Sequence, residues 1–206
     1  MKKLKLSLLL LLAILLNSNL LKADSPLTST NIYEAYNELL IIDVALEADG
    51  KINQEIMFFL TGSQSIDKKM ALINALGWNI DGQNNAETFL DFLQKKKKYK
   101  NRFDFMQKGT ADELLCMAYI LAMDNYFDVR EALEIAEKAL SKNKKSYTFN
   151  IITALIRAQN VFDKDWCEVY KCTDSVRKNK KLKLDLQKPA LDIIFGYMDL
   201  YKDECK

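Results

Sequence analysis

The sequence predicts an all-α protein made of antiparallel helical hairpins that pack into a compact, repeat-like bundle. Only 6 Gly and 2 Pro occur in 206 residues, too few for the many turns of a β-sandwich or β-barrel. Hydrophobic residues make up 49% and the formal net charge is only +2, which excludes a disordered chain. Apolar side chains recur at spacings of three and four over nearly the whole length, which is the period of an α-helix.

Residues 1–23 have the pattern of a secretory signal peptide. Lysines come first, an apolar run over Leu6–Leu16 follows, and the small residue Ala23 ends a short polar stretch. The apolar run is shorter than the roughly 20 residues that cross a bilayer. We therefore expect cleavage after Ala23, export to the periplasm or out of the cell, and no stable membrane insertion afterwards. An uncleaved N-terminal anchor is the alternative.

The remaining residues, 24–206, are expected to form a single α-helical domain. A break near 103–110 offers an alternative division into subdomains over 24–105 and 110–206. Cleavage would remove four of the 30 Lys+Arg and none of the 28 Asp+Glu, which leaves a formal charge of −2. A balance so close to zero gives no reason to expect a nucleic-acid partner.

Helix-capping residues locate the elements of the first half. Ser29 and Thr30 are suited to cap the first helix, and Gly50 is suited to end it. Its apolar stripe comprises Tyr33, Tyr36, Leu40 and Val44. The expected helices cover residues 31–48, 53–60, 65–77 and the segment from the Asn84-Asn85 pair to the basic run at Lys95.

Two capping boxes mark the start of the second half. Thr110 and Glu113 precede a helix over 114–126, and Asp128 and Glu131 form a similar box with Asp as the cap. Three further helices are expected to begin near Ser146, Asp163 and Pro189. The longest expected loop is 177–188, and Gly196 is expected where another helix approaches closely.

Residues 114–159 combine small side chains with a short link between two helices. The sequence Glu131-Ala132-Leu133 opens the second helix, Ala136 and Ala139 follow on one face, and a capped helix comes next. This segment resembles a tetratricopeptide-type repeat, although its turn is longer and it lacks the usual proline after the second helix. The resemblance implies TPR- or HEAT-like packing and an interaction module, because such repeats bind peptides or protein surfaces. An ordinary helical hairpin is the alternative.

The four cysteines favour an oxidising compartment. An even number in an exported chain predicts two disulfides among Cys116, Cys167, Cys172 and Cys205, and three pairings are open. Cys167 and Cys172 lie about 140° apart around a continuous helix, so they do not pair unless the helix breaks. We favour a bond between Cys167 and Cys205 across two antiparallel helices.

No metal or cofactor site is expected. The chain has no His, which removes Ser-His-Asp triads, Cys-His pairs and His-ligated zinc, and the cysteines lack CxxC spacing. The segment 48–55 looks like the middle of an EF-hand loop. If Gly50 takes the sixth position, Ala45 and Ile56 occupy the first and twelfth, where the two most important carboxylates belong. A turn followed by a helix cap explains the same residues.

Basic side chains and aromatic residues are the candidate partner contacts. The basic candidate site comprises Lys95, Lys96, Lys97, Lys98, Lys100 and Arg102, and further basic clusters lie at 142–145 and 177–183. The chain up to Glu55 is acidic, so the charge is distributed unevenly along the sequence. Such an uneven distribution favours an oppositely charged partner. Solvated helix ends that complement helix dipoles are the alternative. Aromatic residues left exposed would make good interface anchors; those considered are Tyr33, Tyr36, Trp78, Trp166, Tyr170, Tyr197 and Tyr201.

These observations favour an exported, non-catalytic protein that binds a protein partner. One form of this hypothesis is an inhibitor or immunity protein that neutralises a periplasmic toxin. A second is an envelope scaffold or adaptor. The alternative from another class is a small glycosidase that acts on the cell wall with one or two carboxyl groups.

Overall fold

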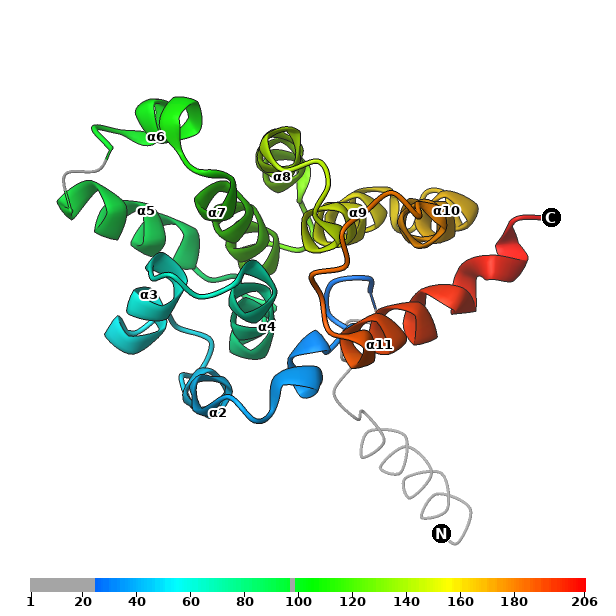
Figure 1. The fold of residues 1–206 in the computed structure, drawn as a ribbon, viewed down its shortest axis with the longest axis horizontal. Helices are drawn as coiled ribbons and strands as arrows, with labels where there is room; N and C mark the ends of the chain where they lie inside the picture. Colours follow the sequence, from blue (N-terminus) through cyan, green and yellow to red (C-terminus); the bar gives the residue numbers. More distant parts are fainter. Residues whose placement is uncertain (1–24, 97–98) are drawn as a thin grey trace, which may run out of the picture.

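The computed structural model describes residues 25–96 and 99–206, in which every regular element is a helix (Figure 1). The all-α prediction is therefore confirmed, whereas the signal-peptide prediction for residues 1–23 lies outside the described residues. In chain order the elements are η1 (Ile32–Tyr36), α2 (Leu40–Leu46), α3 (Gln54–Thr61), α4 (Ile66–Leu76), α5 (Asn85–Lys95), α6 (Arg102–Lys108), α7 (Ala111–Asp124), α8 (Arg130–Lys142), α9 (Tyr147–Val161), α10 (Trp166–Lys178), α11 (Lys188–Met198) and η2 (Asp199–Glu204), where η marks a 3₁₀ helix.

Helix α7 lies at the centre of the hydrophobic core. It packs against α4, α5, α8 and α9, and residues 113–120 are all buried because apolar side chains surround the helix. Helix α6 occupies most of the segment 103–110, where the sequence suggests a boundary between the two halves. Side chains from both halves of the chain therefore meet on α7. The division into subdomains over 24–105 and 110–206 stays a prediction.

Helices α7 to α10 form consecutive antiparallel hairpins, because each packs on the next and short turns join them. Ala132, Ala136 and Ala139 are buried on one face of α8, where it packs against α7 and α9. The hairpin architecture is confirmed, and the tetratricopeptide likeness stays a prediction. Turns 125–129 and 162–165 lie at one end of these helices, and turns 143–146 and 179–187 lie at the other.

The N-terminal segment, residues 25–36, connects the two halves. Its helix η1 packs on both α4 and α11. The side-chain oxygen of Asn74 accepts a hydrogen bond from the Tyr33 amide at 3.1 Å. The side-chain nitrogen of Asn74 donates to the Thr30 carbonyl at 3.1 Å and to the Tyr119 hydroxyl at 3.0 Å. This buried amide therefore fixes the segment to α4 and α7.

The predicted helix over 31–48 is wrong as a single element. The chain is extended at Leu39, which separates η1 from α2. Tyr36 and Ile42 are both fully buried, yet on one continuous helix they would point about 120° apart. The break allows each to face the core. Leu40, which the prediction placed on the apolar stripe, is instead 82% exposed.

The caps of the other helices agree with the sequence in part. Asn53 and Ser146 accept hydrogen bonds from backbone amides, and Thr110 forms its capping box. Two predicted starts are wrong: Val129 is the N-cap of α8 in place of Asp128, and Asp165 caps α10 in place of Asp163. The predicted close approach at Gly196 is also wrong, because a β-carbon built there would have no neighbour within 4 Å.

Candidate interaction surface

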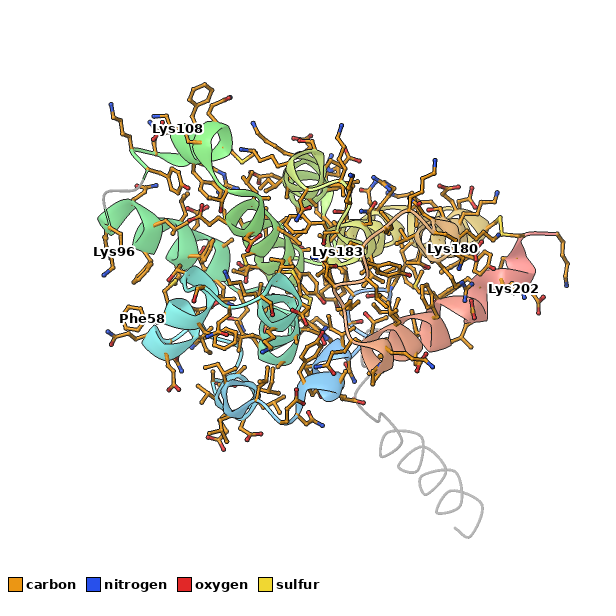
Figure 2. The ribbon with its side chains drawn as sticks, viewed as in Figure 1. Phe58, Lys96, Lys108, Lys180, Lys183 and Lys202 are labelled. Carbon is orange, nitrogen blue, oxygen red and sulfur yellow. A yellow bond between two sulfur atoms is a disulfide. The ribbon has the colours of Figure 1, made fainter. Side chains whose placement is uncertain are left out.

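The residues of the basic candidate site have unrelated roles in the structure. Arg102, at the start of α6, forms ion pairs with Glu87 of α5, at 2.6 Å, and with Glu131 of α8. The Lys96 ammonium lies 5.5 Å from the ring centre of Phe92 and 5.9 Å from that of Phe58 (Figure 2). Both basic groups therefore hold neighbouring elements together.

The other members of that site are not gathered into one surface. Lys95 and Lys100 are exposed, and the Lys100 backbone amide donates to the Asp104 carboxylate at 3.1 Å. Lys97 and Lys98 lie outside the described residues. Partner binding by this site stays a prediction.

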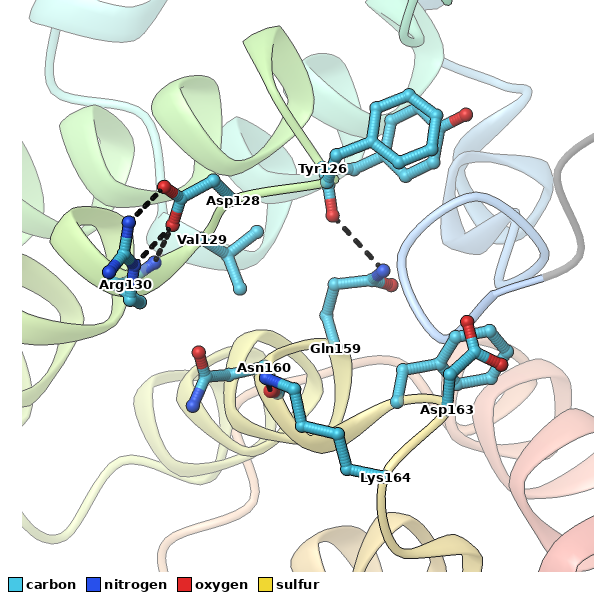
Figure 3. Close-up of a pocket in the computed structure, with 10 residues that line it drawn as sticks. Tyr126, Asp128, Val129, Arg130, Gln159, Asn160, Asp163 and Lys164 are labelled. Atoms are coloured by element: carbon cyan, nitrogen blue, oxygen red, sulfur yellow. Dashed lines mark hydrogen bonds and ion pairs between the residues drawn. The ribbon is translucent and has the colours of Figure 1, made fainter.

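A pocket of about 390 Å³ opens between the α7–α8 turn and the α9–α10 turn (Figure 3). The Gln159 side chain crosses it, donating to the Tyr126 carbonyl at 3.1 Å and accepting from the Leu27 amide at 3.4 Å. These bonds join α9, the α7–α8 turn and the N-terminal segment. Gln159 therefore fixes α9 relative to the α7–α8 turn, and both of these segments line the pocket.

Aromatic rings line one side of this pocket. Tyr126 is buried, packs edge-on against Trp78 and lies 4.2 Å from the ring of Phe127. Phe127 is 71% exposed. Among the described residues, the Tyr126 hydroxyl is the one buried side-chain polar atom without a hydrogen-bond partner.

A second pocket adjoins the first, because Phe162 and Asp163 line both. In it, the rings of Trp166 and Tyr201 stack in parallel at 5.5 Å, and Phe162 packs edge-on against Trp166 at 4.9 Å. Leu200 lies beside them and is 69% exposed. We call this continuous region the aromatic end surface; it comprises Phe127, Phe162, Trp166, Leu200 and Tyr201.

A disulfide holds the second half of the aromatic end surface in place. Cys167 of α10 and Cys205, just after η2, are bonded with their α-carbons 4.7 Å apart, which confirms the favoured pairing. Arg177 adds ion pairs to Asp174 and Asp199, at 2.9 and 2.7 Å. The short C-terminal helix that carries Tyr201 is therefore fastened to α10 at two points.

The expected second disulfide is wrong. Cys116 and Cys172 are free and buried, because Cys116 lies inside the core on α7 whereas Cys172 lies on α10, which packs on α9 and η2. Burial raises the pKa of the Cys116 thiol to about 12 and that of Cys172 to about 11. Both thiols are therefore neutral at physiological pH and poor nucleophiles.

The charges around the first pocket are mixed, and two of them, Asp128 and Arg130, form an ion pair. The Arg130 guanidinium donates two hydrogen bonds to the Asp128 carboxylate, at 2.6 and 2.8 Å, and these bonds lower the pKa of Asp128 to about 2. Asp128 is thus ionised at neutral pH and suited to a charge pair rather than to proton donation. Within residues 25–96 and 99–206, no group of three or more metal-ligating side chains could hold an ion.

Only part of this surface was predictable. Trp166 and Tyr201 were among the aromatic residues considered, whereas Tyr36 is buried in the core. Phe127, Phe162 and Leu200 were missed. The available signal for Phe127 was its place in a turn between two amphipathic helices, where the core does not require a large apolar side chain.

The fold and this surface together define a helical protein with a preformed aromatic contact region. No helix in the described part of the chain has both the length and the apolar composition for a membrane crossing. Comparison of the chain with protein-family models, with curated proteins and with solved structures gives no match.

Proposed function

We propose that the chain is an exported, non-catalytic helical module that binds a protein partner through the aromatic end surface. The observation that carries the proposal is the set of large apolar side chains that stay exposed on a braced scaffold. Trp and Tyr side chains held rigidly supply much of the binding energy of protein interfaces, because little side-chain entropy is lost on binding. Phe127 and Leu200 would be the outer contacts of this set.

Export is supported by the disulfide between Cys167 and Cys205, since such bonds persist in oxidising compartments. The bond is compatible with an extracytoplasmic protein. Export also places the partner in the periplasm or outside the cell. We favour a toxin as the partner, which would make this chain an inhibitor or immunity protein. The argument is an analogy of type, because a small, helical, disulfide-bearing exported protein resembles immunity proteins in general form.

The chemistry of the pockets supports binding over catalysis. A glycosidase needs one carboxyl group that stays protonated near neutral pH. The pKa of Asp128 is shifted in the opposite direction by Arg130. The two free thiols are buried and neutral.

The test is affinity capture of a partner by two matched double variants. Phe127→Ser/Leu200→Ser changes the aromatic end surface, whereas Leu40→Ser/Phe103→Ser changes two equally exposed apolar residues elsewhere. We expect wild type and the second variant to recover the same partner from envelope and secreted fractions. The first variant should bind it about tenfold more weakly or worse.

Equal recovery by both variants would contradict the proposal, and so would a failure of wild type to recover any stoichiometric partner. Circular dichroism and thermal unfolding of each variant would show that the fold is retained. Exposed substitutions of this kind are expected to change the free energy of unfolding by less than about 0.5 kcal/mol.

A second candidate function is an envelope scaffold or adaptor. It is favoured by a basic surface at the opposite end of the hairpin helices, described below. A scaffold would recover several partners through more than one surface, whereas an inhibitor would recover a single partner with high affinity.

A further inference from the structure

Two lysine-rich segments that are distant in the sequence meet at one end of the bundle. The Lys183 amide donates to the Lys145 carbonyl at 2.7 Å, and the Tyr147 amide donates to the Lys183 carbonyl at 2.9 Å. These bonds form a short parallel bridge between the α8–α9 turn and the connection from α10 to α11. Figure 2 labels Lys180 and Lys183 on that connection.

A side-chain clamp fixes the same connection. The Thr148 amide and hydroxyl donate to the Asp185 carboxylate at 2.8 and 3.0 Å, and the hydroxyl also lies 2.7 Å from the Asp185 carbonyl. The Asp185 carboxylate is therefore bonded to Thr148. The lysine side chains around it are therefore presented on a fixed backbone.

Most of the charge at this end is unpaired. Lys178 pairs with Asp174, at 2.5 Å, and Lys142 donates to the Gly109 carbonyl at 2.8 Å. Four further lysines are exposed and have no ion-pair partner among the described residues; they are Lys144, Lys145, Lys181 and Lys183. All four lie in the connections that follow the C-terminal ends of α8 and α10.

An exposed apolar side chain lies within this basic group. Leu184 is 60% exposed between Lys183 and the clamped Asp185. We call this region the basic end surface; it comprises Lys144, Lys145, Lys181, Lys183 and Leu184. A leucine among unpaired lysines suits a surface that offers anionic groups above an apolar layer, and long lysine stems reach headgroups while the leucine enters below them.

We propose that the basic end surface docks the protein on an anionic phospholipid surface. The lipid headgroups supply the complementary charge, and Leu184 supplies a shallow apolar contact. Docking is peripheral and needs no membrane-spanning helix. An acidic protein would also complement the charge, but Leu184 stands alone among the lysines and lacks the cluster of large apolar anchors that protein interfaces use, so the lipid surface is favoured.

The geometry leaves the aromatic end surface free during docking. The turns that carry residues of the two surfaces lie at opposite ends of α9, whose 15 residues are about 22 Å long. The proposal is therefore independent of partner binding by the aromatic end surface. A membrane-docked molecule would present Phe127 and its neighbours away from the bilayer.

The test is vesicle cosedimentation of the oxidised protein, purified from an exporting host and with its N-terminus determined. Vesicles of phosphatidylcholine alone are compared with vesicles in which about a third of the lipid is phosphatidylglycerol. We expect binding only to the anionic vesicles, weakening as salt screens the charges. Neutral vesicles would reveal any binding by a retained apolar N-terminal run.

Variants locate the contact. Lys181→Gln/Lys183→Gln should reduce binding to anionic vesicles by about tenfold or more, because each lysine near such a surface contributes several-fold. At high salt, where the lysine charges are screened, Leu184→Ser should also weaken binding to the anionic vesicles. The matched control, Lys51→Gln/Lys171→Gln, removes the same charge from exposed positions elsewhere and should bind as wild type does.

Three outcomes would overturn the proposal. They are no binding of wild type to anionic vesicles, equal losses in the two lysine double variants, and preferential binding of polyglutamate over anionic vesicles. The last outcome would show that the surface recognises an acidic polypeptide. Recovery of a partner by the aromatic end surface is measured separately, so the two proposals fail independently.

Discussion

Two buried asparagines join segments that lie far apart along the chain. Asn74 bonds the N-terminal segment to α4 and α7. The Asn85 side chain accepts from the Ile52 amide at 2.9 Å and donates to the Gly50 carbonyl at 2.8 Å. The segment that resembles an EF-hand loop therefore serves as a backbone partner for α5. An amide suits both positions, because it donates and accepts at once.

We expect Asn74→Ala to lower the free energy of unfolding by about 3 kcal/mol. The substitution leaves the Tyr33 amide and the Tyr119 hydroxyl without a partner and removes one of the two hydrogen bonds to the Thr30 carbonyl, and buried polar groups without partners are costly. Urea unfolding measures the change. Asn84→Ala is the matched control, since Asn84 is exposed and its side chain makes no capping bond. Similar losses in the two variants would contradict this account.

The Asp174 carboxylate gives a prediction about pH. Burial raises its pKa, but hydrogen bonds from Lys178 and Arg177 outweigh burial and leave the pKa below its usual value. A carboxyl group with a lowered folded-state pKa stabilises the fold above the unfolded-state pKa, near about 3.9. That contribution is lost as the pH falls through the folded-state value.

We therefore expect Asp174→Asn to destabilise the protein by about 2 kcal/mol at neutral pH. The difference in the free energy of unfolding between this variant and wild type should shrink below about pH 4, because wild type loses the same ion pairs there. Urea unfolding at several pH values makes the comparison. A difference that stays constant down to about pH 3 would show that the carboxylate charge is not responsible.

At the level of elements, local signals predicted most helices but not their exact limits. Caps that lie next to their helix, such as Asn53, Thr110 and Ser146, were found from the sequence. The side chain that caps the start of α5 could not be found in this way. The Ala86 amide, in the first turn of α5, donates to the Asp124 carboxylate at 2.7 Å, and Asp124 lies 38 positions away in the sequence. The break between η1 and α2 is also tertiary in origin, since it follows from two buried side chains on different faces.

The fastening of η2 to α10 leads to a prediction for the disulfide. Replacing Cys205 by Ser should lower the free energy of unfolding by about 2 kcal/mol, the low end of the usual range, because the released C-terminal element can fray alone. Hydrogen exchange should become faster over 199–204 and stay unchanged in α7. Wild type under reducing conditions should behave like the variant. Unchanged exchange over 199–204 would contradict the bracing role.

At the level of the whole molecule, the hairpin architecture explains why the two surfaces are separate. Turns alternate between the ends of α7 to α10, so loop residues gather into two groups. The basic segments near 145 and 183 were visible in the sequence, but their meeting was not, because it depends on a bridge between Ser146 and Lys183, which are 37 positions apart. The aromatic end surface likewise depends on turns from different hairpins and on the disulfide.

The central claim is that a protein partner binds the aromatic end surface, and the most direct measurement is hydrogen exchange of the protein alone and in complex with its captured partner. We expect slower exchange in the complex over 126–130, 162–166 and 199–204, with little change over 100–108 or 179–187. Protection confined to the segment around Lys95–Arg102, with none at 126–130 and 162–166, would contradict the claim and favour the basic candidate site instead.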